Sequence, residues 1–273
     1  MALAPRIAYR RPMSGYMRSV GDHLKGWRQR RRLSQLDLAT EANISARHLS
    51  FVETGRSVPS REMILHLAEE LKIPMRERNV LLVAGGYAPI FQERALDDPA
   101  LTAAREAIEI VLRGHQPYPA FAIDRRWDIV GSNGALPVLY EGVRADLLEK
   151  PVNGLRLSLH PEGLAPRIAN LVEWRSHLLR RLREQIEVTA DADLLALQRE
   201  LSGYPSSAGP HEPRGNGVIV PLRIDTSVGR LSFLSTTMVF GTPVDITLSE
   251  LAVETFFPAD QETVEIVRGL PPV

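Results

Sequence analysis

Residues 34–59, SQLDLATEANISARHLSFVETGRSVP, predict two short helices joined by a tight turn. The first helix runs from Gln35 to Ala42 and the second from Ala46 to Thr54, each with apolar residues at helical spacing. A serine precedes each helix, where its hydroxyl can accept a hydrogen bond from the first turn. Asn43 occupies the corner, and asparagine tolerates the left-handed backbone that a sharp turn needs. The neighbouring segments are therefore expected to pack around this helical pair.

Three further helices are predicted on either side of the pair, at Val20–Leu33, Ser60–Leu71 and Pro74–Ala84. Two consecutive short helices, the second carrying polar side chains, form the layout that places a helix in the DNA major groove. With its LSQ, NIS and ETGRSVPS segments, the region resembles the helix-turn-helix domain of the XRE family, the class of the phage repressors and Cro proteins. The resemblance implies an all-α domain of five helices over residues 20–84 that binds a double-stranded DNA operator.

The resemblance also implies roles for individual residues. Gln35 stands where family members hold a backbone phosphate, which fixes register on DNA without reading sequence. Arg47 is the candidate for direct readout, because a guanidinium can bind guanine O6 and N7; a phosphate contact is the alternative. Arg28 and Glu53 correspond to a structural ion pair in some repressors and are predicted to meet. The predicted DNA-binding residues are Gln35, Ser45, Ala46, Arg47, His48, Ser50, Phe51 and Arg56.

Charge divides the chain of 273 residues into two unlike parts, as its length suggests for about two domains. Residues 1–94 hold 16 Lys/Arg against 9 Asp/Glu, whereas residues 95–273 hold 17 against 24. The first part therefore carries a net charge of +7 and the second −7. This difference fits a phosphate-binding module joined to a domain with another task.

Composition also excludes several classes of site. The sequence holds no cysteine, which excludes disulfides, thiolate zinc sites and thiol redox sensing. Its seven histidines fall at no spacing that brings two onto one helix turn, so a metal site is not expected. No apolar run approaches the roughly 20 residues of a membrane span, and no signal peptide is visible. These features predict a soluble cytoplasmic protein without a membrane partner or a resident cofactor.

Three segments are interpreted as connections. Residues 1–19 carry four arginines and form either a flexible basic tail or an arm that reaches a neighbouring DNA groove. Residues 85–99, GGYAPIFQERALDDP, combine glycine, proline and an acidic pair, and are typical of a linker between domains. Residues 206–217 are predicted to form a flexible polar loop. The second domain then covers residues 100–273.

This second domain is predicted to mix helices and strands. Residues 119–124 and 125–133, PAFAID and RRWDIVGSN, read as two strands joined by a tight turn, after which Asn133 would cap a helix. A long helix is expected from Glu162 to Val188, and Asp191 or Asp193 would cap the next one. Three strand-like runs follow, at residues 217–224, 230–240 and 251–258. Two strands, a helical middle and three more strands predict one antiparallel sheet with helices packed on a face.

The second domain resembles the ligand-binding domain of MmyB-like transcription regulators. The resemblance rests on RRWDIVGSN, on NGLRLSLHPEG before EWRSHLLRRLREQ, and on the strands at the end of the chain, and it covers roughly residues 90 to 265. It implies an α+β, PAS-like fold with a cavity between sheet and helices, and a fatty-acid-like ligand. The family motifs consist mostly of core and turn residues, so they specify a fold without specifying a chemistry.

Residues that would line such a cavity are taken from the predicted strands and from the long helix. Aromatic side chains and methionine on strands can form either a cavity wall or a plain core. Arg175 interrupts an apolar helix stripe and could hold a carboxylate head group; an ion pair elsewhere is the alternative. Arg180, Arg181 and Arg183 read as a solvated helix face. The ligand-binding candidates are Phe121, Ile123, Trp127, Arg175, Phe233, Met238 and Phe240.

No pattern in the sequence predicts an enzyme. The nucleophile elbow, the phosphate-binding loop and the dinucleotide fingerprint are all missing from the sequence. Asp128, His160 and Glu173 are isolated polar residues that a catalytic alternative would need. The sequence instead predicts a homodimeric transcription regulator that senses a small apolar molecule. In the remaining alternative, the second domain only dimerises or binds a protein partner.

Overall fold

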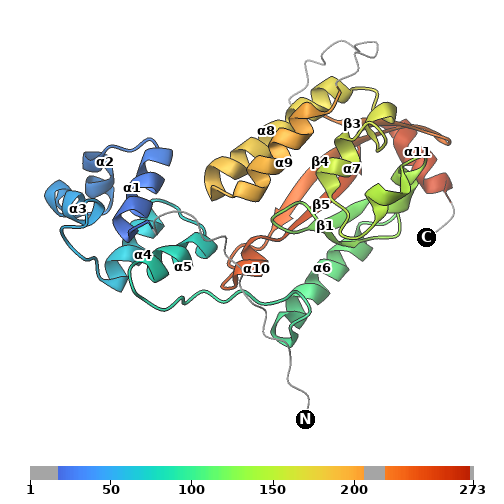
Figure 1. Ribbon diagram of the computed structural model, residues 1–273. Coiled ribbons are helices and arrows are strands. Elements are labelled where there is room, and N and C mark those ends of the chain that lie inside the picture. The colour runs from blue at the N-terminus through green and yellow to red at the C-terminus, as the bar shows by residue number, and fades with distance from the viewer. Residues whose placement is uncertain (1–17, 206–218, 271–273) are drawn as a thin grey trace. The chain divides into compact units, whose positions relative to one another are not determined.

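The computed structural model describes residues 18–205 and 219–270 (Figure 1). Predictions for residues 1–17 of the basic arm and for the loop at 206–217 lie outside these residues. The chain forms two compact units, the first reaching Ile90 and the second beginning at Phe91; residues 74–76 group with the second unit. Among the helices of the described residues, none is both long and apolar enough to cross a membrane.

The first unit contains the five helices that the sequence predicts. Each begins and ends within three residues of the expected positions, so the five-helix fold is confirmed. Their buried apolar side chains, Leu24, Leu38, Leu49 and Ile64 among them, form a core with almost no exposed surface. The helices are α1 (Val20–Arg30), α2 (Gln35–Glu41), α3 (Ala46–Glu53), α4 (Arg61–Glu70) and α5 (Met75–Ala84).

The predicted helix caps and corner are also confirmed. Ser34 Oγ accepts a hydrogen bond from Asp37 N, and Ser45 Oγ accepts one from His48 N, each at 3.1 Å. Both bonds satisfy amide groups that the first turn of a helix leaves without a partner. Asn43 has a φ of 51°, the left-handed conformation expected at the corner between α2 and α3.

A glycine allows α1 and α3 to approach closely. A Cβ atom built on Gly21 would lie 2.4 Å from the carbonyl oxygen of Val52 and 2.8 Å from that of Glu53. These oxygens belong to the backbone, so a methyl group at Gly21 can be accommodated only if the two helices separate. Gly26, on the same helix, has no atom within 4 Å of the corresponding position.

We therefore expect opposite effects from the same substitution at these two glycines. Gly21→Ala should destabilise the first unit by about 1–3 kcal/mol, because overpacking outweighs the better helix propensity of alanine. Gly26→Ala should stabilise it by up to about 1 kcal/mol, since only propensity changes. Urea unfolding of each variant, and hydrogen exchange of its α1 and α3 amides, measure the two changes in stability. Equal effects at the two positions would contradict the close approach.

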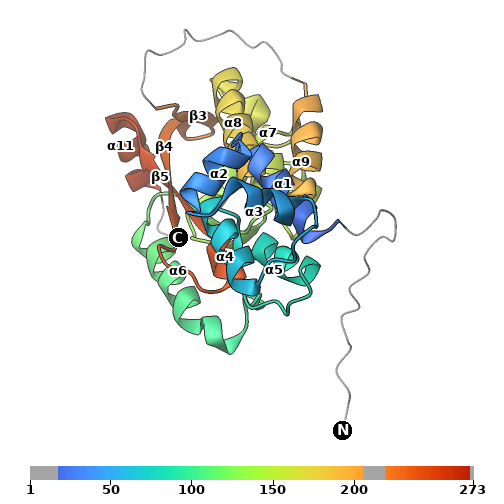
Figure 2. The same cartoon turned by 90° about the vertical axis from the view of Figure 1, so that its left-hand side faces the viewer.

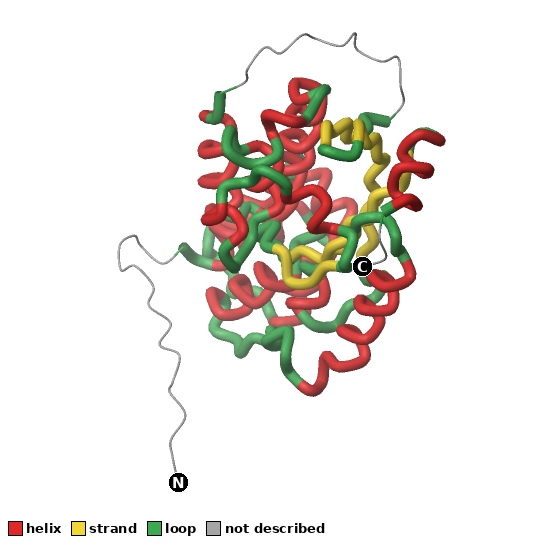
Figure 3. The backbone as a smooth tube through the Cα atoms, turned by 90° about the vertical axis from the view of Figure 1, so that its right-hand side faces the viewer, coloured by secondary structure: helices red, strands yellow, loops and turns green. Residues whose placement is uncertain are grey.

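The second unit is built on one antiparallel sheet of five strands. The spatial order is β2-β1-β5-β4-β3, so the last strand in the sequence pairs with the first. Figure 3 shows the strands in yellow. This arrangement confirms the prediction of two strands, a helical middle and three more strands closing one sheet. The strands are β1 (Ala120–Ile123), β2 (Ile129–Ser132), β3 (Leu222–Thr226), β4 (Gly229–Val239) and β5 (Ala252–Pro258).

Successive strand residues point to opposite faces of this sheet, which separates two apolar clusters. Ala120 and Ala122 on β1 pack with Ile108 and Leu112 of α6 on one face. The other face carries the larger cluster, which includes Phe233 and Phe256 and reaches the helices between β2 and β3. The helices of the unit are α6 (Thr102–Gly114), α7 (Gly154–Leu159), α8 (Leu171–Thr189), α9 (Ala192–Gly203), α10 (Ile246–Ser249) and α11 (Gln261–Gly269); short 3₁₀ turns are η1 (Pro99–Leu101), η2 (Leu136–Tyr140), η3 (Ala145–Leu148) and η4 (Ala165–Arg167).

Two details of the predicted helices are wrong. The long helix begins at Leu171 rather than Glu162, because residues 161–170 form turns and the short η4, which contains a proline. Asn133 does not cap a helix: its buried amide accepts from Ala120 N and donates to the carbonyls of Leu112 and Tyr118. It therefore ties α6 to the start of the sheet. The cap predicted at Asp191 is confirmed, since its carboxylate accepts from Asp193 N.

The second half of the predicted linker is anchored to the second unit. Arg94 forms an ion pair with Asp245 at 2.8 Å, and its carbonyl accepts a hydrogen bond from Thr247 Oγ1 at 2.6 Å. The carbonyl of Gln92 accepts from Ile246 N at 2.8 Å. Asp245 is 1% exposed, so this attachment point lies inside the unit.

Candidate functional site

A buried ion pair joins the helices of the first unit, as the sequence predicts. Arg28 Nε donates to Glu53 Oε1 at 2.7 Å and Nη2 to Oε2 at 2.9 Å, which links α1 to α3. This hydrogen-bonded contact raises the pKa of Arg28. Gln35 Nε2 also donates to Glu53 Oε2, at 2.7 Å. Glu53 is therefore a structural residue that positions Gln35 at the start of α2.

One aromatic ring on α3 organises two arginines at the surface. The guanidinium of Arg47 lies 5.3 Å from the ring centre of Phe51, and that of Arg56 lies 6.0 Å from it. Both arginines are exposed, whereas Phe51 is half-buried. An arginine over an aromatic face is held by attraction to the ring and loses less freedom when it binds a ligand. The ring of Phe51 therefore holds the guanidinium groups of Arg47 and Arg56. The sequence alone did not reveal this role of Phe51.

The remaining candidates for DNA contact lie on the same stretch of chain (Figure 2). Ser45 is exposed at the N-terminus of α3, and Ala46, His48 and Ser50 are half-buried along that helix. Together with Gln35, the predicted residues belong to α2, to α3 with its N-terminal cap, and to the turn after α3. Most of these side chains are polar or basic, as contacts to phosphates and base edges require.

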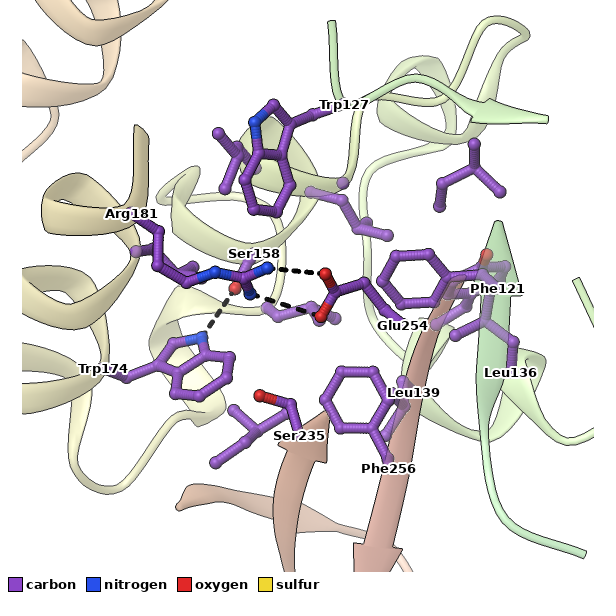
Figure 4. Close-up of a pocket in the computed structure, with 18 residues that line it drawn as sticks. Phe121, Trp127, Leu136, Leu139, Ser158, Trp174, Arg181, Ser235, Glu254 and Phe256 are labelled. Carbon is purple, nitrogen blue, oxygen red and sulfur yellow. Dashed lines mark hydrogen bonds and ion pairs between the residues drawn. The ribbon is translucent and has the colours of Figure 1, made fainter. Parts of the chain in front are cut away.

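The second unit encloses an apolar cavity between its sheet and helices (Figure 4). Its volume is about 50 Å³. The walls come from all five strands, from α7 and α8, and from the turn η2. The lining residues are Phe121, Trp127, Ile129, Leu136, Leu139, Tyr140, Gly154, Leu155, Leu157, Ser158, Leu164, Trp174, Leu178, Arg181, Leu222, Ser235, Glu254 and Phe256.

One ion pair lies in the wall of this cavity. Arg181 on α8 donates from Nη2 to Glu254 Oε1 at 2.6 Å and from Nη1 to Oε2 at 3.2 Å. Thr237 Oγ1 on β4 accepts from Arg181 Nη2 and donates to Glu254 Oε1, both at 2.8 Å. The side chain of Glu254 is 3% exposed and that of Arg181 is 23% exposed. The pair therefore joins α8 to β4 and β5. It places two opposite charges, which neutralise each other, in an otherwise apolar wall.

An indole covers the guanidinium of this pair. Arg181 lies 4.9 Å from the ring centre of Trp127, and Trp127 Nε1 donates to Gln185 Oε1 at 2.7 Å. Trp127 has a φ of 68°, because the turn between β1 and β2 is closed by hydrogen bonds to Asp124. A left-handed backbone is unusual for a residue with a large side chain. It is tolerated here because hydrogen bonds to Asp124 hold the backbone of Trp127 and the bond to Gln185 holds its indole.

A second indole occupies the opposite wall. Trp174 Nε1 donates to Ser158 Oγ at 3.0 Å, which ties α8 to α7. His177 stacks on this indole with ring centres 5.5 Å apart. Burial lowers the pKa of His177, and the positive charges of Arg181 and Arg180 lower it further. The imidazole is therefore neutral near pH 7 and adds no charge beside the cavity.

The structure brings only some of the predicted ligand-binding residues together. Phe121 and Trp127 line the cavity, whereas Ile123 and Phe233 are packed in the adjoining core. Met238 is partly exposed on β4, and Phe240 packs in the cluster under α6. Arg175 lies away from the cavity walls: its Nη2 donates to the carbonyls of Leu201 and Ser202 at 3.0 and 2.9 Å. It thus binds the C-terminal end of α9, where a cation is favoured.

Comparison with known proteins relates both units to families. Residues 104–270 match the MmyB-like transcription regulator ligand binding domain, which covers more than half of the chain. The chain belongs to the MmyB-like transcription regulators. Residues 19–81 match a helix-turn-helix domain. This MmyB-like protein is accordingly a DNA-binding transcription regulator with a helix-turn-helix domain and a ligand-binding domain.

A curated relative matches a shorter part of the chain. The HTH-type transcriptional repressor RghR of Bacillus subtilis (strain 168) is 38% identical over 80 residues, which are 29% of this chain. The chain spans 58% of the length of that repressor. Among solved structures, an RNA-binding light-oxygen-voltage receptor matches over 92% of this chain and 62% of its own, with 15% identity and a TM-score of 0.27. A score this low relates neither the folds nor the functions of the two proteins.

The ion pair of this MmyB-like domain was missed by the sequence analysis, which placed Arg181 on a solvated helix face. That interpretation is wrong, because Arg181 binds the buried Glu254. Spacing could have revealed both residues. Trp174, Leu178 and Arg181 follow at positions i, i+4 and i+7, which lie on one helix face. Glu254 stands two residues before Phe256 and therefore shares the core-facing side of its strand.

The polar residues considered for catalysis take part in separate local contacts of the MmyB-like domain. Asp128 Oδ1 accepts from Asn153 Nδ2 at 2.9 Å, and Glu173 Oε2 accepts from Asn170 Nδ2 at 3.2 Å. His160 Nδ1 accepts from the amide of Glu162 at 3.0 Å. Each contact stabilises a turn or a helix end, and none of the three residues lines the cavity.

Proposed function

We propose that the chain binds a double-stranded DNA operator as a homodimer and that a small apolar or fatty-acid-like molecule in its C-terminal cavity controls this binding. The observation that carries the proposal is an enclosed apolar cavity in a unit that follows a helix-turn-helix domain. A single recognition helix covers only a few base pairs, so two symmetric half-sites are needed for high affinity and specificity. The antiparallel sheet with helices between β2 and β3 supports the PAS-like interpretation of this unit.

Control of DNA binding requires that the ligand has different affinities for two arrangements of the protein. A molecule that binds both arrangements equally shifts nothing, however tightly it binds. The cavity walls belong to α7, α8 and the five strands, so a ligand that enlarges the cavity would move α8 relative to the sheet. The ion pair between α8 and β5 is the contact that such a movement would strain first.

The volume of the cavity favours a second candidate function. Ligand pockets usually enclose about 300–1,000 Å³, whereas this cavity encloses about 50 Å³. A space of this size holds a few water molecules, and a larger ligand needs side chains to move. The alternative is a C-terminal unit that only dimerises or binds a protein partner.

Mass spectrometry of the purified chain, under native conditions and after solvent extraction, tests the proposal. A small molecule present in stoichiometric amount would support sensing, provided that its removal changes operator affinity. The operator is first obtained by selecting bound sequences from a random pool of double-stranded DNA. A chain that carries no molecule, and whose operator affinity is unchanged by apolar compounds, would support the alternative.

Arg47 gives the sharpest test of the DNA-binding surface. Arg47→Ala should weaken binding to the selected operator by about 1–3 kcal/mol and relax specificity at one base pair, because a bidentate contact to guanine is lost. Arg113→Ala is the control, since this exposed arginine lies on α6 of the second unit. Competition between operator variants measures the effect. Equal weakening on all sequences would show that Arg47 binds phosphate rather than a base.

A further inference from the structure

The charges in the cavity wall select among the apolar ligands that the proposed function allows. Of the described residues that line the cavity, only Arg181 and Glu254 carry a charge near neutral pH. They bind each other through two hydrogen bonds, at 2.6 and 3.2 Å. The wall is therefore close to electrically neutral, with one cation and one anion already paired.

An anionic head group would find no available cation in this wall. Both terminal nitrogens of Arg181 face Glu254, one of them also binds Thr237, and Trp127 covers the guanidinium. A ligand carboxylate must either lie beside the Glu254 carboxylate or take Arg181 from it. Taking Arg181 away would leave the Glu254 carboxylate, which is 3% exposed, without a cation. An unpaired buried charge is strongly unfavourable.

A cationic head group meets the reverse difficulty. It could approach Glu254 only by replacing Arg181, whose guanidinium would then lie against Trp127 without a carboxylate. Ser235 and Tyr140 also line the cavity, and their hydroxyls form no hydrogen bond with the part of the chain that the structure describes. A hydroxyl can donate or accept one hydrogen bond without requiring a charged partner.

We infer that the cavity selects a compact, uncharged ligand with an apolar or aromatic body and one hydroxyl or carbonyl group. The inference rests on the proposed sensing function and narrows its ligand class. The aromatic side chains Phe121, Phe256, Trp127 and Trp174 surround the body of such a ligand (Figure 4). Its polar group binds Ser235 or Tyr140, and the ion pair stays closed. Side chains must move to admit any such ligand, and a compact ring requires less movement than a long chain.

A matched series of head groups tests this selection. Benzyl alcohol, benzoate and benzylamine share one ring and differ in charge near pH 7; octanol and octanoate form the corresponding chain pair. Calorimetric titration into the full chain should show benzyl alcohol binding at least about tenfold tighter than benzoate and benzylamine, and octanol tighter than octanoate. Benzoate or octanoate binding as tightly as its alcohol would overturn the inference and leave the sensing proposal intact. If no compound of the series binds, the inference fails, whereas the sensing proposal is decided separately by mass spectrometry of the purified chain.

Glu254→Gln provides an internal control, because it leaves Arg181 as an unpaired cation in the wall. This variant should bind benzoate at least about tenfold tighter than the parent chain, so that the preference for the alcohol shrinks or reverses. In Arg181→Gln with Glu254→Gln, the wall is again neutral and the preference for benzyl alcohol should return. Circular dichroism verifies that both variants fold. An unchanged benzoate affinity in folded Glu254→Gln would overturn the role assigned to the pair.

Discussion

Replacing Glu53 with alanine should destabilise the first unit by about 3–5 kcal/mol. The substitution leaves Arg28, whose side chain is 10% exposed, without the carboxylate that binds two of its nitrogens. It also releases Gln35 from its hydrogen bond to Glu53. Small domains are stable by about 5–15 kcal/mol, so this loss removes a large share of the total. Hydrogen exchange of the α1–α3 amides, resolved by peptide, measures the effect within this unit.

A double variant separates the stability of the pair from its positioning role. Arg28→Met with Glu53→Leu replaces both charges with apolar side chains of similar size, which should restore most of the lost stability. Operator affinity should still fall, because Gln35 has no anchor in this variant. The structural role of Glu53 would be refuted by a Glu53→Ala chain whose amides exchange as slowly as those of the parent.

Replacing Arg181 with methionine should destabilise the second unit by about 3–5 kcal/mol at neutral pH. Glu254 then remains buried without a cation, although Thr237 still donates one hydrogen bond. Urea unfolding of the variant and the parent chain, followed by tryptophan fluorescence, measures the loss.

The control for this prediction lies on the same helix. Arg183→Met removes an exposed arginine of α8 and should change stability by no more than about 0.5 kcal/mol. Similar losses in the two variants would indicate a general need for positive charge on α8. An Arg181→Met chain as stable as the parent would show that the buried carboxylate of Glu254 does not need this cation.

Local signals were sufficient to predict the first unit. Its serine caps, the asparagine corner and the apolar spacing all act within one or two helical turns, and each was found where expected. The sheet of the second unit was predicted for a similar reason, since alternation and turn residues mark strands locally. The long helix was extended too far, because apolar spacing continues through the turn segment before Leu171.

The cavity wall could be predicted only in part. Phe121 and Trp127 were identified because they are aromatic residues in the predicted strand segments. Arg181 and Glu254 are 73 residues apart, and their partnership depends on how α8 crosses the sheet. The same limit explains Arg175, which differs from Arg181 by six positions and therefore lies on another helix face, toward α9. Tertiary packing decides which of several arginines meets the buried carboxylate of Glu254.

The distribution of tryptophan equips the chain with an intrinsic optical probe. Of its three tryptophans, Trp127 and Trp174 lie in the cavity wall, and Trp27 is buried in the first unit. A guanidinium 4.9 Å from the Trp127 ring makes the emission of that indole sensitive to any shift of Arg181. Ligand entry can therefore be followed by fluorescence without a label, with Trp127→Phe and Trp27→Phe assigning the signal to one unit or the other.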